Sequence, residues 1–192
     1  MRKAALVVVD VQKDFCEGGA LAAANTMSLL APLKTFIDEA RRRGVLIVYT
    51  RDWHPDDHSS FHTAGGPWPV HCVAEQQGSE LMAPLHAEPQ DLMIHKGVGV
   101  EGAGYSGFDE TVLEPELLKE GITKVGIAGI ATEYCVRATA LDAHKAKFDT
   151  TVLNDLIRAV KHEDGPRVLA ELRQAGIEVA DADAWLAEVR AV

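Results

Sequence analysis

The strongest constraint on the fold is a series of six short apolar runs separated by amphipathic segments. The runs occupy residues 5–9, 45–49, 91–94, 125–128, 150–153 and 176–179. Short runs rich in valine and isoleucine are typical of parallel strands that are buried on both faces. Their alternation with helical segments predicts an α/β fold, with a three-layer α/β/α arrangement around a doubly wound, mainly parallel six-stranded sheet.

Several of the intervening segments have the periodicity of helices. One apolar stripe, closed by Gly44, consists of Leu29, Leu33, Phe36, Ile37 and Ala40. A second, entered through residues 164–166 and closed by Gly176, consists of Val168, Leu169, Leu172 and Ala175. A short C-terminal helix is marked by Trp185, Leu186 and Val189. We expect residues 1–192 to form a single domain, since this length suits one core.

Composition excludes several classes of function. The net charge is −10 and the basic residues are scattered, which argues against a nucleic-acid partner. The three cysteines are an odd number without CxxC spacing, so they predict neither a disulfide framework nor a structural zinc site. No apolar stretch approaches the roughly 20 residues that span a bilayer, and the N-terminus does not resemble an export signal. We therefore expect a cytoplasmic protein without a membrane partner.

Chemically useful side chains follow the first four predicted strands. Asp10 ends the first strand, residues 51–54 follow the second, Lys96 follows the third, and Cys135 comes shortly after the fourth. In open parallel sheets, ligands bind beyond the carboxyl ends of the strands. Residues 51–80 and 96–110 are also long and irregular, as functional loops often are. The sequence thus predicts a site at this edge of the sheet.

Cys135 is the candidate nucleophile of this site. Thr132 would be a natural N-cap, which would place Cys135 in the first turn of a helix, where unpaired amides and the helix dipole favour a thiolate. The alternative is a buried structural cysteine. Asp10 as a base and Lys96 as a stabilising ammonium would together explain a reactive thiol, although either residue alone is weak evidence.

A second group, between the second and third strands, suits a metal ion. Asp52, His54, His58 and His71 offer one carboxylate and three imidazoles within 20 positions. Such ligands bind zinc, iron or manganese, and the sequence does not choose among the three. The spacing of His54, His58 and His62 mimics a helical metal motif, but Pro55 indicates a loop. His62 therefore remains an alternative or an addition to His58.

These motifs, in this order, resemble the nicotinamidases, a family of isochorismatase-like cysteine hydrolases. The matching segments are residues 8–19 around Asp10, Asp52-Trp53-His54-Pro55 with His58, residues 68–73 around His71, Lys96-Gly97, residues 105–108, and residues 129–137 around Cys135. The resemblance covers about residues 5–160. It departs from the family pattern at Glu133-Tyr134 and in the glycine-rich residues 98–104, and the loop around residues 62–66 is shorter than in some members.

The resemblance implies a role for each matched residue. Cys135 would be the nucleophile, Asp10 the general base and acid, and Lys96 the stabiliser of the thiolate. The amides of Ala131 and Cys135 would form an oxyanion hole, with a cis peptide bond between Ile130 and Ala131. The implied metal ligands are Asp52, His54, His58 and His71, around one divalent ion. The implied pocket wall is Phe15, Trp68 and Tyr105.

The implied reaction is hydrolysis of nicotinamide to nicotinate and ammonia through a cysteine thioester. The partner would be a small-molecule amide, and the chain could also form a homo-oligomer, as family members often do. Two alternatives remain open at this point. One is another cysteine amidase of the superfamily with a carbamoyl or ureido substrate. The other is a metal-dependent small-ligand binding protein that does not turn over.

Overall fold

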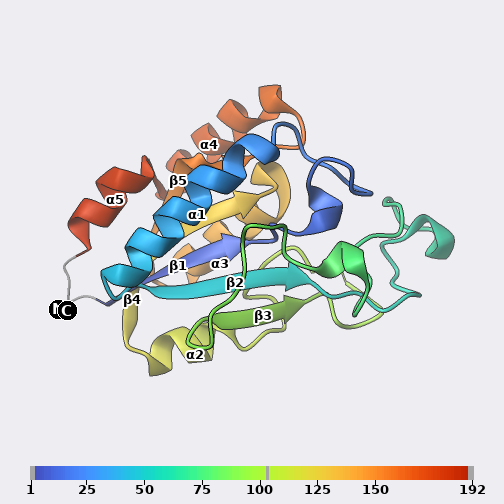
Figure 1. Cartoon of the computed structure of the whole chain (residues 1–192), viewed down its shortest axis with the longest axis horizontal. Coiled ribbons are helices and arrows are strands. Elements are labelled where there is room, and N and C mark those ends of the chain that lie inside the picture. The colour runs from blue at the N-terminus through green and yellow to red at the C-terminus, as the bar shows by residue number, and fades with distance from the viewer. Residues whose placement is uncertain (1–2, 103, 190–192) are drawn as a thin grey trace.

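The computed structural model describes residues 3–102 and 104–189, and it contains the predicted six-stranded sheet. The strands are β1 (Lys3–Val9), β2 (Leu46–Asp52), β3 (Leu92–Lys96), β4 (Ile122–Ile130), β5 (Asp149–Arg158) and β6 (Glu178–Ala180). Their order is β3-β2-β1-β4-β5-β6, and every neighbouring pair is parallel (Figure 1). The predicted fold class is confirmed.

Helices cover both faces of this sheet. They are α1 (Met27–Arg42), α2 (Leu113–Lys119), α3 (Arg137–Lys145), α4 (Gly165–Gln174) and α5 (Ala182–Glu188). Buried residues of α1 and α5 share one core with alternate residues of β1, and those of α2, α3 and α4 share the other. The chain therefore forms three layers, with one hydrophobic core on each side of the sheet.

Strand β1 shows why the apolar runs become central strands. All residues from Ala4 to Val9 are buried, and their side chains alternate between the two cores. Leu6 and Val8 join the core under α1, whereas Val7 and Val9 join the opposite one. A strand with both faces covered needs apolar residues at every position, which explains why the run is continuous rather than alternating.

At their carboxyl ends, β2 and β5 run furthest beyond the predicted apolar runs. Strand β2 continues through the polar residues Thr50, Arg51 and Asp52 because these pair with the end of β3. Strand β5 continues past Leu153 to Arg158, and its register against β4 shifts between Ile127 and Gly129. These extensions carry polar side chains to the carboxyl edge of the sheet.

The strand order places a crevice at that edge. The chain winds from β1 to β2 and β3 in one direction and then returns to β4, β5 and β6 on the other side of β1. Ligands bind at such a topological switch point, beyond the carboxyl ends of the adjacent strands. Residues between β2 and β3 form only short 3-10 turns, such as His62–Ala64 and Gln77–Ser79, and their loops lie beyond this edge (Figure 1).

Within the described residues, no helix has the length and apolar character needed to cross a membrane.

Candidate active site

The side chains of Asp10, Lys96 and Cys135 meet at this crevice. The Lys96 ammonium nitrogen lies 2.8 Å from an Asp10 carboxylate oxygen and 3.5 Å from the Cys135 sulfur. It also donates to the Gly104 carbonyl at 2.8 Å and makes a short contact with the Asp52 carboxylate. The Lys96 side chain is 0% exposed, so four partners surround it within the protein. The structure thus brings together three residues that lie far apart in the sequence.

Cys135 lies on a tight turn between β4 and α3. The turn, Thr132–Val136, is a single π-helical turn whose N-cap is Ala131, and no side chain caps it. The prediction that Thr132 caps a helix is therefore wrong, because Thr132 is buried inside the turn. The peptide bond between Ile130 and Ala131 is cis, in agreement with the resemblance.

Gly129 allows the strand that leads to this turn to lie against β1. Its φ is +117°, and a Cβ atom there would lie 2.1 Å from the Val9 carbonyl oxygen. A side chain at this position would push β4 away from the end of β1, where Asp10 begins the crevice. This glycine is therefore required for the close approach of the acid and the thiol.

Burial controls the protonation of the three central groups. It raises the pKa of the Cys135 thiol well above its usual range, although Lys96 opposes the rise. It also raises the pKa of Asp10, again opposed by Lys96. Burial disfavours the Lys96 ammonium, but the Asp10 and Asp52 carboxylates hold its pKa well above its usual range. At rest the thiol is therefore protonated and the lysine charged, which differs from the thiolate that a helix N-terminus alone would favour.

Asp52 joins this group to the histidine cluster. One of its carboxylate oxygens contacts Lys96, and the other lies 3.4 Å from the His54 Nε2 atom. Ligand atoms of Asp52, His54 and His71 all lie within 4.8 Å of one another. The His58 ring lies next to the His54 ring at a tilt of 31°, with 4.1 Å between their centroids. Three of the predicted ligands, Asp52, His54 and His71, therefore gather beside Lys96, and His58 lies next to them without belonging to the group within 4.8 Å.

The three imidazoles direct their Nδ1 atoms outward. His54 Nδ1 bonds the Gly97 carbonyl at 2.8 Å, and His71 Nδ1 bonds the Pro69 carbonyl at 2.8 Å. His58 Nδ1 lies 2.7 Å from the Ser60 hydroxyl oxygen. The bonds of His54 and His71 to carbonyls leave their Nε2 atoms for a metal ion, as is usual for ligating histidines.

The chemistry of this group fits a divalent cation. His58 Nε2 is buried and has no hydrogen-bond partner among the described residues, which a ligand atom facing a cation would explain. Burial lowers the pKa of His58 to about 4 and also lowers that of His71, so both rings are neutral, as ligands must be. His62 is exposed and bonds the Pro67 carbonyl through Nε2, so the structure places it outside the cluster.

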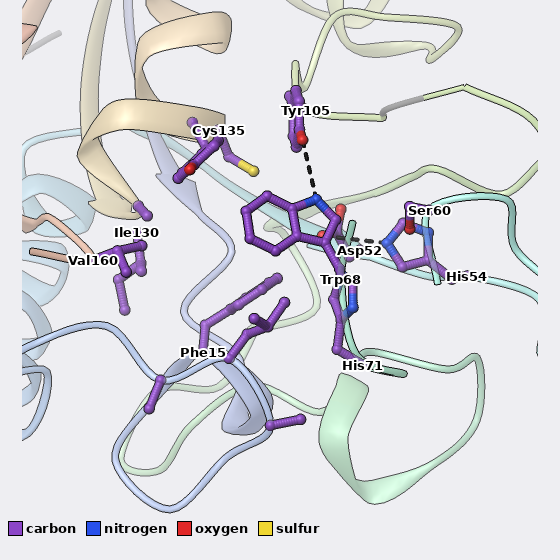
Figure 2. Close-up of a pocket in the computed structure, with 15 residues that line it drawn as sticks. Phe15, Asp52, His54, Ser60, Trp68, His71, Tyr105, Ile130, Cys135 and Val160 are labelled. Atoms are coloured by element: carbon purple, nitrogen blue, oxygen red, sulfur yellow. Dashed lines mark hydrogen bonds and ion pairs between the residues drawn. The ribbon is translucent and has the colours of Figure 1, made fainter. Parts of the chain in front are cut away.

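A pocket of about 290 Å³ opens beside Cys135 and the metal-ligand cluster. Its walls include the three predicted residues Phe15, Trp68 and Tyr105 (Figure 2). The Trp68 indole N–H donates to the Tyr105 hydroxyl oxygen at 3.2 Å, which fixes the indole plane in the pocket. A pocket of this size has room for a flat aromatic ring with a small substituent, which would be largely buried there.

Sequence reasoning missed other residues of the pocket. They are Ala20, Leu21, Ala22, Ser60, Ile130, Tyr134 and Val160. Tyr134 packs edge-on against Trp68, with 5.3 Å between ring centroids. Its position directly before the candidate nucleophile Cys135, in the predicted first turn of a helix, was the available signal. Leu21 and Val160 carry no such signal, because only the fold brings their loops to the pocket.

Supporting contacts around Asp10 and Asp52 were also missed. Thr50 donates its hydroxyl to the Asp10 carboxylate at 2.7 Å. The buried Gln12 side chain accepts from the Asp52 amide at 2.8 Å and donates to the carbonyls of Asp52 and Ser79, at 2.9 and 3.0 Å. These bonds fix the backbone that carries Asp52 between Lys96 and His54.

Comparison with known proteins agrees with this geometry. The Isochorismatase domain matches residues 4–184. A nicotinamidase/pyrazinamidase of Mycobacterium tuberculosis is 36% identical over 181 residues, which cover 91% of this chain and 97% of the relative. A nicotinamidase of Escherichia coli is 31% identical over 204 residues, with 94% and 96% covered. The structure of the pyrazinamidase of Pyrococcus horikoshii in complex with zinc matches with a TM-score of 0.90 at 41% identity, covering 93% of this chain and 99% of that one.

Proposed function

This chain belongs to the isochorismatase domain family, and from that premise we propose that it hydrolyses nicotinamide to nicotinate and ammonia through a thioester on Cys135. The proposal rests mainly on one observation. The Lys96 Nζ atom contacts both an Asp10 carboxylate oxygen, at 2.8 Å, and the Cys135 sulfur, at 3.5 Å. Relatives named nicotinamidase, which match nearly the whole chain, support the choice of substrate.

The first half of the reaction forms the thioester. Asp10 takes the proton of the Cys135 thiol, and the Lys96 ammonium stabilises the thiolate because it lies within contact distance of the sulfur. The thiolate attacks the amide carbon, and the backbone amides of Ala131 and Cys135 receive the negative oxygen. Loss of one such donor typically costs roughly 3 kcal/mol of transition-state stabilisation. The carbon–nitrogen bond then breaks, and Asp10 gives its proton to the departing ammonia.

The second half releases the acid. Asp10, again a carboxylate, takes a proton from water, and the resulting hydroxide attacks the thioester carbon. The carbon–sulfur bond breaks, Asp10 returns the proton to the sulfur, and the acid leaves and gives its own proton to solvent to become nicotinate. The raised pKa of the buried Asp10 suits a group that must accept and donate a proton in each half.

The ring is held by the other walls of the pocket. Phe15 and Trp68 line the same pocket as Cys135 (Figure 2) and would contact an aromatic ring. Asp52, His54, His58 and His71 would hold one divalent ion of zinc, iron or manganese. When bound, such an ion supplies a Lewis-acid contact for a pyridine nitrogen. Asp52, His54 and His71 line the same pocket as Cys135, so an ion that they hold would orient the carboxamide toward the sulfur.

Ammonia release from nicotinamide tests the proposal, with Cys135→Ala compared against Cys16→Ala. Cys16 is also buried, but it packs in the core beneath α1 and does not line the pocket. We expect Cys135→Ala to abolish turnover and Cys16→Ala to retain it. Turnover by Cys135→Ala at the wild-type rate would contradict the proposed nucleophile.

The same assay separates the alternatives. Turnover of a carbamoyl or ureido compound without turnover of nicotinamide would identify another amidase of the superfamily. Metal-dependent binding of nicotinamide without ammonia release would identify a binding protein. Either result would overturn the proposed substrate or the proposed reaction.

A further inference from the structure

His58 differs from the other two histidines of the cluster in the partner of its Nδ1 atom. His54 and His71 face backbone carbonyls, at 2.8 Å each. A carbonyl oxygen can only accept, so in the neutral form of each ring the proton sits on Nδ1 and the Nε2 atom keeps its lone pair. The fold therefore fixes the ligating tautomer of these two residues without any metal ion.

The surroundings of His58 leave two tautomers possible. Its Nδ1 atom lies 2.7 Å from the Ser60 hydroxyl oxygen, which can either accept or donate. The backbone N–H of Ser60 also points at the same Nδ1 atom, at 3.3 Å. That amide can only donate, so by itself it favours a proton on Nε2. A ring with that tautomer has no lone pair on Nε2 for a metal ion.

We propose that Ser60 is a positioning residue whose hydroxyl accepts the Nδ1 proton of His58 and thereby makes His58 a metal ligand. Among the described residues, this hydroxyl is the sole acceptor within hydrogen-bond distance of His58 Nδ1. The buried Nε2 atom of His58, which has no hydrogen-bond partner in the described part of the chain, is the second observation. In this tautomer it presents a lone pair to the cluster instead of a buried N–H without an acceptor, which would be costly.

Ser60 is well placed for this role. It lines the same pocket as Asp52 and His54 (Figure 2). It lies two positions after His58, so its hydroxyl and its amide both reach the His58 Nδ1 atom. Replacing it by alanine removes the acceptor but keeps the competing amide donor. The inference rests on the proposed metal centre and adds a residue that controls the affinity of that centre.

The test is a double-mutant cycle with Zn²⁺ alone as the probe, measured by competition with a chromogenic chelator. The proteins are wild type, Ser60→Ala, His58→Ala and the double variant, with Ser59→Ala as the matched control. The Ser59 side chain has no hydrogen bond within the described residues. Loss of a residue that orients a ligand typically weakens metal binding 10–100-fold, roughly, and we expect this for Ser60→Ala. Ser59→Ala should bind as the wild type does.

In the His58→Ala background, Ser60→Ala should cause no further loss, because Ser60 acts through His58. Equal Zn²⁺ affinity of wild type and Ser60→Ala would overturn the role of Ser60 and leave the metal centre intact. Independent, multiplicative losses in the cycle would also overturn it, since Ser60 would then act on the ion by another route. Failure of the wild-type protein to bind Zn²⁺ would overturn the metal centre and this inference together.

Discussion

Replacement of Lys96 by methionine should destabilise the protein strongly and in a pH-dependent way. Methionine has a similar length but no charge, so it would leave the Asp10 and Asp52 carboxylates facing each other without the ammonium between them. Both carboxylates and the lysine are buried. Removing one partner of a buried ion pair costs about 3–5 kcal/mol, because the remaining charge is neither paired nor solvated. For a chain of this size, that corresponds to a melting temperature roughly 6–20 °C lower.

The sign of the pH dependence follows from Asp10. Burial already raises the pKa of Asp10 in the folded protein, and Lys96 opposes that rise. Without Lys96 the folded-state pKa rises further above the unfolded-state value, so the folded variant binds a proton that the unfolded chain releases. The contribution of Asp10 to stability is then fully present below the unfolded-state pKa and is lost as the pH rises through the folded-state pKa, by up to about 1.4 kcal/mol per pH unit. We expect the variant's deficit to be smaller at pH 5 than at pH 7.

Chemical denaturation of both proteins at pH 5 and pH 7, in the presence of a chelator, measures this deficit. Lys124→Met is the matched control, because Lys124 is also buried but its Glu188 partner is 59% exposed and stays solvated. The control should lose less stability than Lys96→Met and show no such recovery at pH 5. Equal losses in the two variants, or a Lys96→Met deficit that does not change with pH, would refute the reasoning.

Other predictions address the pocket and the metal centre. Nicotinamide and pyrazinamide, which have a ring nitrogen meta to the carboxamide, should be hydrolysed much faster than benzamide, which has no ring nitrogen. Comparable rates for all three would contradict the proposed contact to the ring nitrogen. Chelation should abolish turnover, and added divalent metal should restore it. His71→Ala should lose metal binding, whereas replacement of the exposed His62 by alanine should retain it, as measured by metal analysis of the purified proteins. Gly97→Ala should weaken Zn²⁺ binding at least several-fold, because its Cβ would lie 2.4 Å from His54 Cε1 and its φ is +59°; unchanged affinity would contradict this steric argument.

The sheet could be predicted because burial on both faces leaves a direct signature in the sequence. Continuous apolar runs indicated all six strands, and the polar residues that follow them indicated the functional edge. The resemblance to the nicotinamidases is likewise confirmed by relatives that match most of the chain. What the runs did not show is where β2 and β5 end, since the polar extensions of these strands are stabilised by pairing with their neighbours.

Other features depend on contacts that the sequence does not encode locally. Helix α2 was not predicted, because its two buried positions, Leu113 and Leu117, are too few to form a clear stripe. Thr132 resembles an N-cap, but the π-helical turn buries it instead. The contacts of Gln12 with Asp52 and Ser79 span 40 and 67 positions, so only the folded chain reveals them. The protonated resting state of Cys135 also follows from burial, which outweighs the effect expected of a helix start.

The most direct test of the proposed mechanism is the trapping of the covalent intermediate. Wild-type protein is mixed with saturating nicotinamide, quenched in acid within one turnover, digested and examined by mass spectrometry. The account predicts a nicotinoyl group on the peptide that contains Cys135, and none on the peptides with Cys16 or Cys72. A nicotinoyl group on any other residue, or full turnover without a trapped adduct on Cys135 at any quench time, would contradict it.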